Sequence, residues 1–231
     1  MAAAIAFEDG ELAALEKTFR RGRWVDLRDR ALLALGCTCP ARVSEMLALK
    51  ESGVADEQGR VGGVWHCAAK DNKTRTATDY EITATARAAL EAWLPVRRRS
   101  GYRRGDPLFP AQGRKGAMSR GAAWAMVKRR CAEAGVGLRG HSCHSTKKTA
   151  MGNAYDAFLE RQSTGERGID PLIELQRFSG HKSLDSVLHY LRTARKDKAK
   201  REGAAAASKR ARILLGADLE TGEAGEAGKE E

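Results

Sequence analysis

The chain has few proline and aromatic residues, and its cysteines are not numerous enough for a disulfide-rich scaffold. Its 231 residues include five Pro and five Cys, and aromatic side chains make up 6%. No apolar run approaches the roughly 20 residues that a membrane-spanning helix needs. The first residues, MAAAIAFEDGE, have no basic segment ahead of an apolar one and soon become acidic, so they do not resemble a signal peptide. From these absences we expect neither a membrane-spanning protein nor a secreted chain held together by disulfides.

The cysteines do not indicate a metal site or a disulfide. Their number is odd, and no two pairs have the spacing of zinc ligands. Without a secretion signal, the expected compartment is the reducing cytoplasm, where the thiols are free. Cys37 and Cys39 lie in an apolar stretch and are expected to be buried.

Positive charge is what the chain has in excess. The 41 Lys and Arg outnumber 30 Asp and Glu, which gives a net charge of +11. A surplus of this size indicates a polyanionic partner, most often nucleic acid. Residues 97–120 hold eight basic residues and one acid, and residues 192–212 hold nine and two. Residues 217–231 are acidic, and the tail 201–231 is expected to be disordered.

Apolar spacing predicts a mainly α protein with a small antiparallel β-sheet. Residues 61–83 are rich in Val, Trp, Thr and Tyr, with a turn at Asp71-Asn72, and predict a β-hairpin. Residues 97–116 are expected to form a loop. Ser119 is the expected N-cap of one helix, and Pro95 the expected end of another. The expected helices lie at residues 7–20, 25–50 (two helices broken at Pro40), 84–95, 120–134, 145–159, 171–179 and 184–196.

Two short segments place a cation at a turn. In ARVSE, Arg42 stands at a helix start, where a guanidinium can make two parallel bonds to a phosphate. In KDNKTRT, Lys70 stands at the hairpin turn, where it can hold a phosphate or donate a proton. Taken alone, Arg42 also fits a surface residue paired with Glu45, and Lys70 fits a solvated turn.

Two further segments combine histidine with lysine or tyrosine. His144 and Lys147 are three residues apart on a helix, so both can approach one phosphate. His181 follows Gly180 at a turn, and Tyr190 comes nine residues later. A Tyr hydroxyl has a pKa of about 10 and needs nearby cations to act as a nucleophile. Each segment alone also fits an ordinary helix start or a core tyrosine.

In this order the segments resemble the catalytic domain of the tyrosine recombinase (phage integrase) family, over roughly residues 8–192. The family pattern is an Arg at a helix start, a Lys on a β-hairpin, an H-x-x-R box, a G-H turn and a Tyr nine residues after that His. The chain has ARVSEMLAL, KDNKTRT, HSTKKTAMGNAYDA and SGHKSLDSVLHYL at these places. DPLFP and SRGAAWAMVKRRCAEAGV match the family's connecting strand and helix.

Three features depart from the pattern. Lys147 stands where the family has its second arginine, which keeps the charge and loses the planar fork. A second register, His141-x-x-His144, leaves no cation at that place. Cys-Pro-Ala precedes Arg42 in place of Thr-Gly-x. Only about 25 residues come before the RDRALL helix, so the N-terminal domain of most relatives is expected to be absent.

The resemblance implies a recombinase that cuts and rejoins DNA without a metal or cofactor. Tyr190 would attack the phosphate and form a 3′-phosphotyrosine. Arg42 and Lys147 would neutralise the phosphorane oxygens, with His181 donating a hydrogen bond. His144 would take the tyrosine proton or hold a phosphate oxygen. Lys70 would protonate the leaving 5′-oxygen, with Lys73 as the alternative, and Glu45 would orient Arg42.

Two other readings of the resemblance stay open, beside a third alternative in which the motif matches are accidental and the chain is a basic helical DNA-binding protein. One is a catalytically impaired DNA-binding relative, which the lysine at 147 favours. The other is a nicking-closing enzyme similar to the type IB topoisomerases. The direction of the reaction (integration, excision, inversion or resolution) is open as well.

The expected partner is double-stranded DNA, bound by a homo-tetramer with accessory DNA-bending proteins as possible partners. The expected location is the cytoplasm, in association with the nucleoid. Basic side chains outside the catalytic set would follow the DNA backbone and supply affinity that falls with salt. These predicted contacts are Lys73, Arg75, Arg97, Arg98, Arg99, Arg103, Arg104, Lys115, Arg120 and Lys148.

Overall fold

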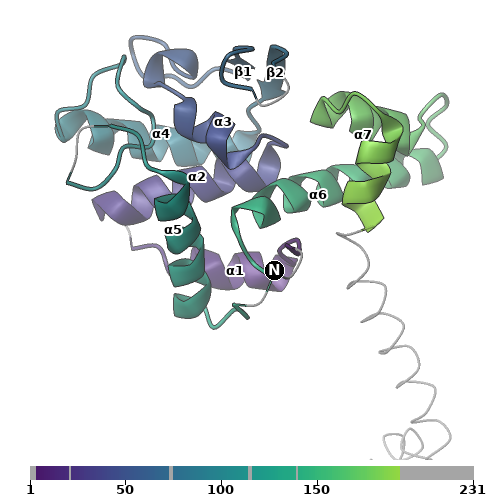
Figure 1. The fold of residues 1–231 in the computed structure, drawn as a ribbon, viewed down its shortest axis with the longest axis horizontal. Coiled ribbons are helices and arrows are strands. Elements are labelled where there is room, and N and C mark those ends of the chain that lie inside the picture. Colours follow the sequence, from purple (N-terminus) through teal and green to yellow (C-terminus); the bar gives the residue numbers. More distant parts are fainter. Residues whose placement is uncertain (1–3, 21, 73–74, 114–115, 139, 193–231) are drawn as a thin grey trace, which may run out of the picture. The chain divides into compact units, whose positions relative to one another are not determined.

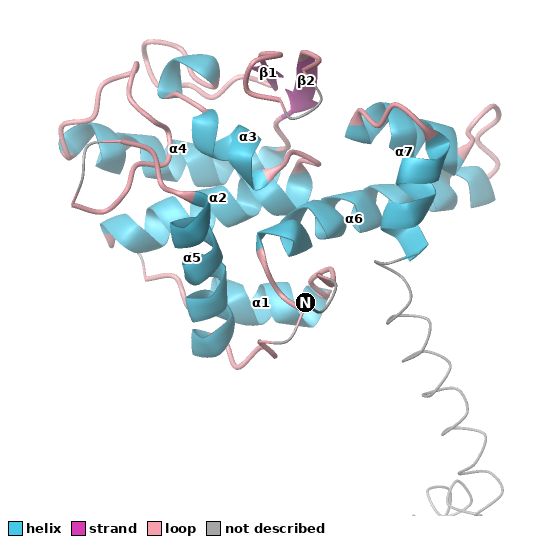
Figure 2. Ribbon diagram, viewed as in Figure 1, coloured by secondary structure: helices cyan, strands magenta, loops and turns pink. Residues whose placement is uncertain are grey.

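The computed structural model describes residues 4–20, 22–72, 75–113, 116–138 and 140–192 (Figure 1). These residues form helices and one two-stranded antiparallel sheet, which confirms the predicted fold class (Figure 2). The labelled helices are α1 (Asp9–Glu16), α2 (Trp24–Thr38), α3 (Val43–Ala48), α4 (Ala84–Arg99), α5 (Arg120–Glu133), α6 (Cys143–Ser163) and α7 (Pro171–Ser179). A 3₁₀ turn covers Glu51–Gly53, and residues 184–192 are helical to the last described residue.

Helix α2 is the centre of the larger core, and it packs against α4 and α6. Its apolar residues Ala31, Leu32 and Leu35 recur at helical spacing and are buried. Trp93 of α4 is also fully buried, and its indole Nε1 donates to the carbonyl oxygen of Leu108 at 2.9 Å. Apolar burial therefore fixes the long helices around α2.

Helix α4 extends further than predicted. It passes through Pro95 and ends at Arg99, so residues 97–99 are not in a loop. Pro95 is exposed, and the turn that follows it is held by the buried Arg97, whose guanidinium donates to the carbonyl oxygens of Pro107, Asp106 and Arg103. Tertiary hydrogen bonds thus outweigh the local cost of proline inside a helix.

The predicted hairpin is present. Strand β1 (Val64–Cys67) pairs with β2 (Thr78–Glu81), with Trp65 opposite Tyr80. Both of these side chains are buried, and they pack at 5.0 Å between ring centroids. In the connection, the side-chain amide of Asn72 donates to Thr78 Oγ1 at 3.0 Å.

Helix α6 lies very close to α2. A Cβ atom on Gly36 would be 2.9 Å from Thr146 Cβ, closer than real Cβ contacts. The missing side chain of Gly36 therefore sets how near the first turns of α6 approach α2. Further along, α6 packs on α7 and on residues 184–192 around a small second core. This core consists of Met151, Leu175, Val187 and Leu191.

Several expectations concern residues outside the described part. The basic cluster at 192–212 lies almost entirely there, and so do the tail at 201–231 and its boundary with the catalytic domain. Inside the described part, Cys37 and Cys39 are buried as predicted. No helix in the described ranges is long and apolar enough to cross a membrane.

Candidate active site

Four predicted catalytic residues come together from four separate segments. Arg42 is the N-cap of α3, and Lys147 lies in the second turn of α6. His181 follows Gly180, whose φ of +64° ends α7 in the left-handed conformation that favours glycine. Tyr190 projects from the helical residues 184–192. His181 and Tyr190 come from adjacent segments, but Arg42 and Lys147 lie far from them and from each other in sequence, so the fold is what assembles the group.

Arg42 is held by Glu45. Its Nη1 lies 3.0 Å from Glu45 Oε1, and its backbone N–H donates to Oε2 at 2.7 Å. The buried Tyr80 hydroxyl also donates to Oε2, at 3.1 Å. Burial and the neighbouring Glu45 charge raise the pKa of Tyr80, so it stays a donor. Both carboxylate oxygens are occupied, and the side chain of Arg42 stays 24% exposed, available to a ligand.

Lys147 is a buried cation facing Tyr190. The residue is 2% exposed, and its Nζ lies 5.5 Å from the Tyr190 ring centroid. Within the described ranges, no carboxylate lies at ion-pair distance from its ammonium. Burial, followed by repulsion from Arg42, lowers the pKa of Lys147 from 10.5 to about 8.

His181 and Tyr190 pack against each other, with 5.2 Å between ring centroids. Burial and the charges of Lys147 and Arg42 lower the pKa of His181 from 6.5 to about 4. Ser179 Oγ lies 2.6 Å from His181 Nδ1. In a neutral ring whose Nδ1 accepts from that hydroxyl, Nε2 carries the hydrogen and can donate it. Burial raises the pKa of the Tyr190 hydroxyl, while Arg42 acts in the opposite direction.

The other two predicted catalytic residues are exposed. Lys70 lies in the connection after β1, and His144 is in the first turn of α6. The hairpin reaches the turn that holds His181, because a Cβ on Gly180 would lie 3.3 Å from Thr78 Cγ2. Roles for Lys70 and His144 stay predictions. Lys73, the alternative to Lys70, lies outside the described residues.

Burial contradicts two of the predicted DNA contacts. Arg97 is 0% exposed and pairs with the equally buried Glu51 at 2.5 Å. Lys148 is 8% exposed, and its ammonium donates to the carbonyl oxygen of Ala4. Neither side chain can reach a DNA backbone in this structure.

The other predicted DNA contacts differ in exposure. Arg98 is half-buried against Glu51, and Arg104 is half-buried with a bond to the carbonyl oxygen of Ala55. Exposed members are Arg75, Arg99, Arg103 and Arg120. Lys115 lies outside the described residues.

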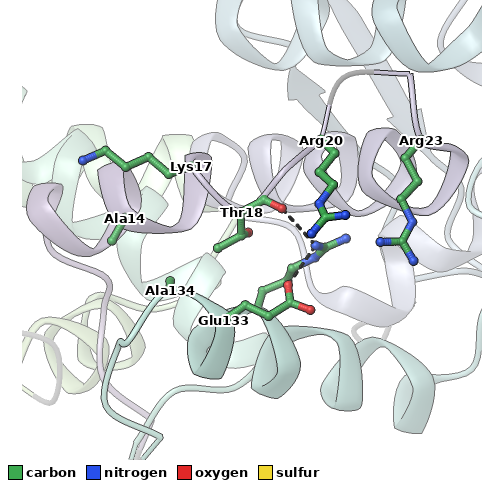
Figure 3. A pocket seen from close by; sticks show the side chains of 8 residues that line it. Ala14, Lys17, Thr18, Arg20, Arg23, Glu133 and Ala134 are labelled. Carbon is green, nitrogen blue, oxygen red and sulfur yellow. Dashed lines mark hydrogen bonds and ion pairs between the residues drawn. The ribbon is translucent and has the colours of Figure 1, made fainter.

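A hollow lined by several basic residues is not among the predicted DNA contacts. The hollow, of about 650 Å³, lies between the α1–α2 connection and the end of α5, and Arg20 and Arg23 both point toward it (Figure 3). The signal in the sequence was the run FRRGR at 19–23. The hollow is lined by Ala14, Lys17, Thr18, Arg20, Arg23, Arg130, Glu133 and Ala134.

Nothing in the described part of the chain resembles a metal site, since no three His, Cys, Asp or Glu side chains gather there. The charged groups near Tyr190 are mostly cations, which suits an anionic ligand.

A model of the phage integrase family matches residues 9–157. The chain belongs to the phage integrase family. The match contains Arg42, Lys70, His144 and Lys147, while His181 and Tyr190 follow it. No curated protein sequence matches the chain.

Solved structures of recombinases share the fold of this phage integrase family member. The XerA recombinase is 19% identical with a TM-score of 0.62, over 90% of this chain and 66% of its own. The XerH site-specific recombinase bound to a palindromic difH substrate is 20% identical with a TM-score of 0.61, over 90% and 54%. The Tn1549 transposon integrase with transposon right end DNA is 16% identical with a TM-score of 0.58, over 88% and 66%. The chain thus spans 54% to 66% of the length of these proteins.

Proposed function

We propose that the chain is a site-specific DNA recombinase that cuts and rejoins DNA through a 3′-phosphotyrosine. One observation carries the proposal: Lys147 and His181 lie against the Tyr190 ring, and Arg42 is close enough to act on the pKa of its hydroxyl, although Arg42 and Lys147 come from distant parts of the sequence. Cations beside a half-buried phenol are what a phosphoryl-transfer site needs, since charge develops on the phosphate oxygens.

The proposed reaction begins when Tyr190 Oη attacks the scissile phosphorus. An O–P bond forms as the Tyr190 proton moves to a base, for which His144 is the expected acceptor; the bond from phosphorus to the 5′-oxygen breaks, and Lys70 gives that oxygen a proton. Arg42 and Lys147 neutralise the non-bridging oxygens, and His181 donates from Nε2. The 5′-hydroxyl of the partner strand then attacks the phosphotyrosine and restores the backbone. Phosphodiester energy is kept in the covalent bond, so the scheme draws on no nucleotide and no metal.

A covalent adduct tests the proposal directly. The protein is incubated with a nicked duplex from the ends of its mobile element, which traps the intermediate, and is run on a denaturing gel. We expect an adduct that Tyr190→Phe abolishes. Tyr155→Phe is the matched control, because Tyr155 also packs on the second core but lies on α6; it should retain the adduct. An adduct that survives in Tyr190→Phe contradicts the assignment.

Two alternatives give different results in the same system. A DNA-binding relative without activity shifts the duplex on a native gel and forms no adduct. A nicking-closing enzyme forms the adduct and relaxes supercoiled plasmid that has a single site. A recombinase needs two matching sites to give exchanged products.

We also propose double-stranded DNA as the partner and a homo-tetramer on it, with accessory bending proteins. Neighbours in the fold comparison were solved with DNA substrates. The exposed Arg75, Arg99, Arg103 and Arg120 suit contacts to the backbone. Cross-linking on two-site DNA, followed by counting the protomers, tests the assembly; only monomers on DNA contradict it.

A further inference from the structure

Lys147 combines features that a phosphate clamp alone does not need. We propose that Lys147 takes the proton from Tyr190 as that oxygen attacks phosphorus, an inference that rests on the proposed function. This is a different role from the charge neutralisation first assigned to it, because it requires the amine to be neutral when the attack begins.

Lys147 is buried directly against the tyrosine whose proton has to leave. Its side chain is buried, and its Nζ is 5.5 Å from the centroid of the Tyr190 ring. Within the described ranges it has no carboxylate at ion-pair distance that would hold it charged. The titratable groups that face it are Cys39 from the end of α2, Arg42 and Glu45 from α3, His181 from the turn after α7, and Tyr190.

The chemistry of lysine agrees with the position. Burial and the adjacent Arg42 lower the pKa of Lys147 to about 8, while Glu45 and Cys39 act in the opposite direction. A share of the amines is therefore neutral close to neutral pH. An arginine at the same place would keep its proton at any working pH.

The neighbouring groups are poorer proton acceptors. Glu45 already accepts from Arg42 and Tyr80 with both oxygens and has no exposed surface. His181, with a pKa of about 4, is a much weaker base than an amine at about 8. Its Nδ1 is also engaged by Ser179. His144 is exposed, so it stays the competitor that an experiment has to separate.

The step balances in atoms and charge. The Tyr190 oxygen forms its bond to phosphorus while its proton moves to the lone pair of Lys147 Nζ. The bond to the 5′-oxygen breaks, and that oxygen leaves with the electron pair and takes a proton from Lys70. The new ammonium then lies beside the anionic phosphotyrosine, where the opposite charges attract. On rejoining, the attacking 5′-hydroxyl gives its proton back to Lys70 as it bonds to phosphorus, the bond from phosphorus to the Tyr190 oxygen breaks, and the Lys147 ammonium returns its proton to that oxygen.

The test measures the rate of adduct formation against pH. The substrate has sulfur in place of the bridging 5′-oxygen, because a thiolate leaves without a proton and Lys70 drops out of the profile. For the wild type we expect the rate to rise with pH and level off above pH 8, because a bound phosphate favours the charged amine. Lys147→Arg should be slower by ~10²–10⁴-fold, the usual contribution of a general base, without that rising limb and with DNA affinity retained.

If Lys147 acts only as a phosphate clamp, the pH dependence of the rate and the effect of Lys147→Arg both have the opposite sign. The wild-type rate would then fall above the pKa of the amine, and Lys147→Arg would match or exceed the wild type. Either result overturns the inference and leaves the proposed function standing. A rising limb that persists in Lys147→Arg but is lost in His144→Gln also overturns it, in favour of His144. No adduct with the wild type overturns the proposed function, and this inference with it.

Chemical rescue gives a second readout. Lys147→Ala leaves a space beside Tyr190, and small primary amines added to the buffer should restore adduct formation. The restored rate should increase with the basicity of the amine among amines of similar size. Equal rescue by the non-basic tetramethylammonium ion would indicate charge alone and contradict proton transfer.

Discussion

Buried charged side chains in this protein have two kinds of surroundings. Between α2 and α5, and again beside α4, each buried arginine meets a carboxylate. Near Tyr190, Lys147 is buried just as deeply without a carboxylate at ion-pair distance in the described ranges. The contrast separates charges that are paired within the fold from the buried amine of the candidate site.

The paired region is a network. Arg130 bonds to Asp26 and Asp29, and Asp29 also accepts from Arg28 at 2.7 Å and from Arg129 at 2.6 Å. Beside α4, Glu51 serves Arg97 in the same manner. Buried pairs of this kind add little net stability compared with apolar residues, but losing one partner is costly, because the other charge stays buried.

The largest expected effect comes from breaking the pair at α4. Glu51→Ala leaves Arg97 charged and buried, and should lower the free energy of unfolding by about 3–5 kcal/mol. Urea unfolding measures it. Glu16→Ala is the control, because Glu16 pairs with Arg30 at an exposed site and should change stability by less than about 1 kcal/mol. Similar losses in both variants would remove the distinction between buried and exposed pairs.

A smaller effect of opposite sign is expected at Lys147. Lys147→Met removes a buried cation that has no carboxylate at ion-pair distance among the described residues, and should raise the unfolding free energy by roughly 1–3 kcal/mol at pH 7, while adduct formation is lost. The folded pKa of about 8 lies below the unfolded 10.5, so the penalty is full below pH 8 and fades as the pH rises to 10.5. The gain should fade over the same window. Lys17→Met, at an exposed lysine, should be neutral; a gain there too would undercut the comparison.

Acid should weaken the paired region next. Burial acts to raise the pKa of Asp26, but the bonds from Arg130 and from the Arg20 backbone outweigh it, and the pKa falls below 3.8. A depressed carboxyl pKa stabilises the fold above the unfolded value and stops doing so as pH falls through the folded value. Thermal unfolding from pH 6 downward should show this loss, and Asp26→Asn should flatten that part of the curve. An unchanged slope in the variant would assign the acid limb to other groups.

The smallest effect on stability is expected at the exposed basic residues. The double variant Arg99→Ala, Arg103→Ala should unfold like the wild type but bind DNA more weakly. If each arginine contacts a phosphate, the slope of log K against log salt should fall by about 0.9 for each. Arg161→Ala is the control, since Arg161 is exposed but paired with Glu166. An equal change of slope in the control would point to net charge alone.

Much of the secondary structure could be predicted from the sequence, because helices and strands leave a periodic pattern of apolar residues. The helices around α2, the hairpin and the Ser119 cap follow from local spacing. Arg97 was predicted to contact DNA, but its side chain is buried. It continues the buried stripe of Ala86, Leu90 and Trp93 at helical spacing. Extending the predicted helix past Pro95 places Arg97 on its buried face.

Other features depend on contacts across long stretches of sequence. Lys148 is buried because residue 4 covers it, and no local pattern reports that contact. The order of the motifs predicted that Lys147 would approach Tyr190. Its burial depends on residues from three other segments of the chain, which supply no carboxylate at ion-pair distance in the described ranges. Local spacing therefore identifies the candidate residues, whereas their pKa values depend on the packing around them.

The close contact at Gly36 has a consequence for how this site can change over generations. A Cβ on Gly36 would meet the Thr146 side chain, one residue before Lys147, so an added methyl group on α2 would press on the turn of α6 that carries the amine. Under the proposed function, a substitution at Gly36 can therefore disturb the site while Arg42, Lys147, His181 and Tyr190 are all kept. A comparison of those four positions alone would miss such a change.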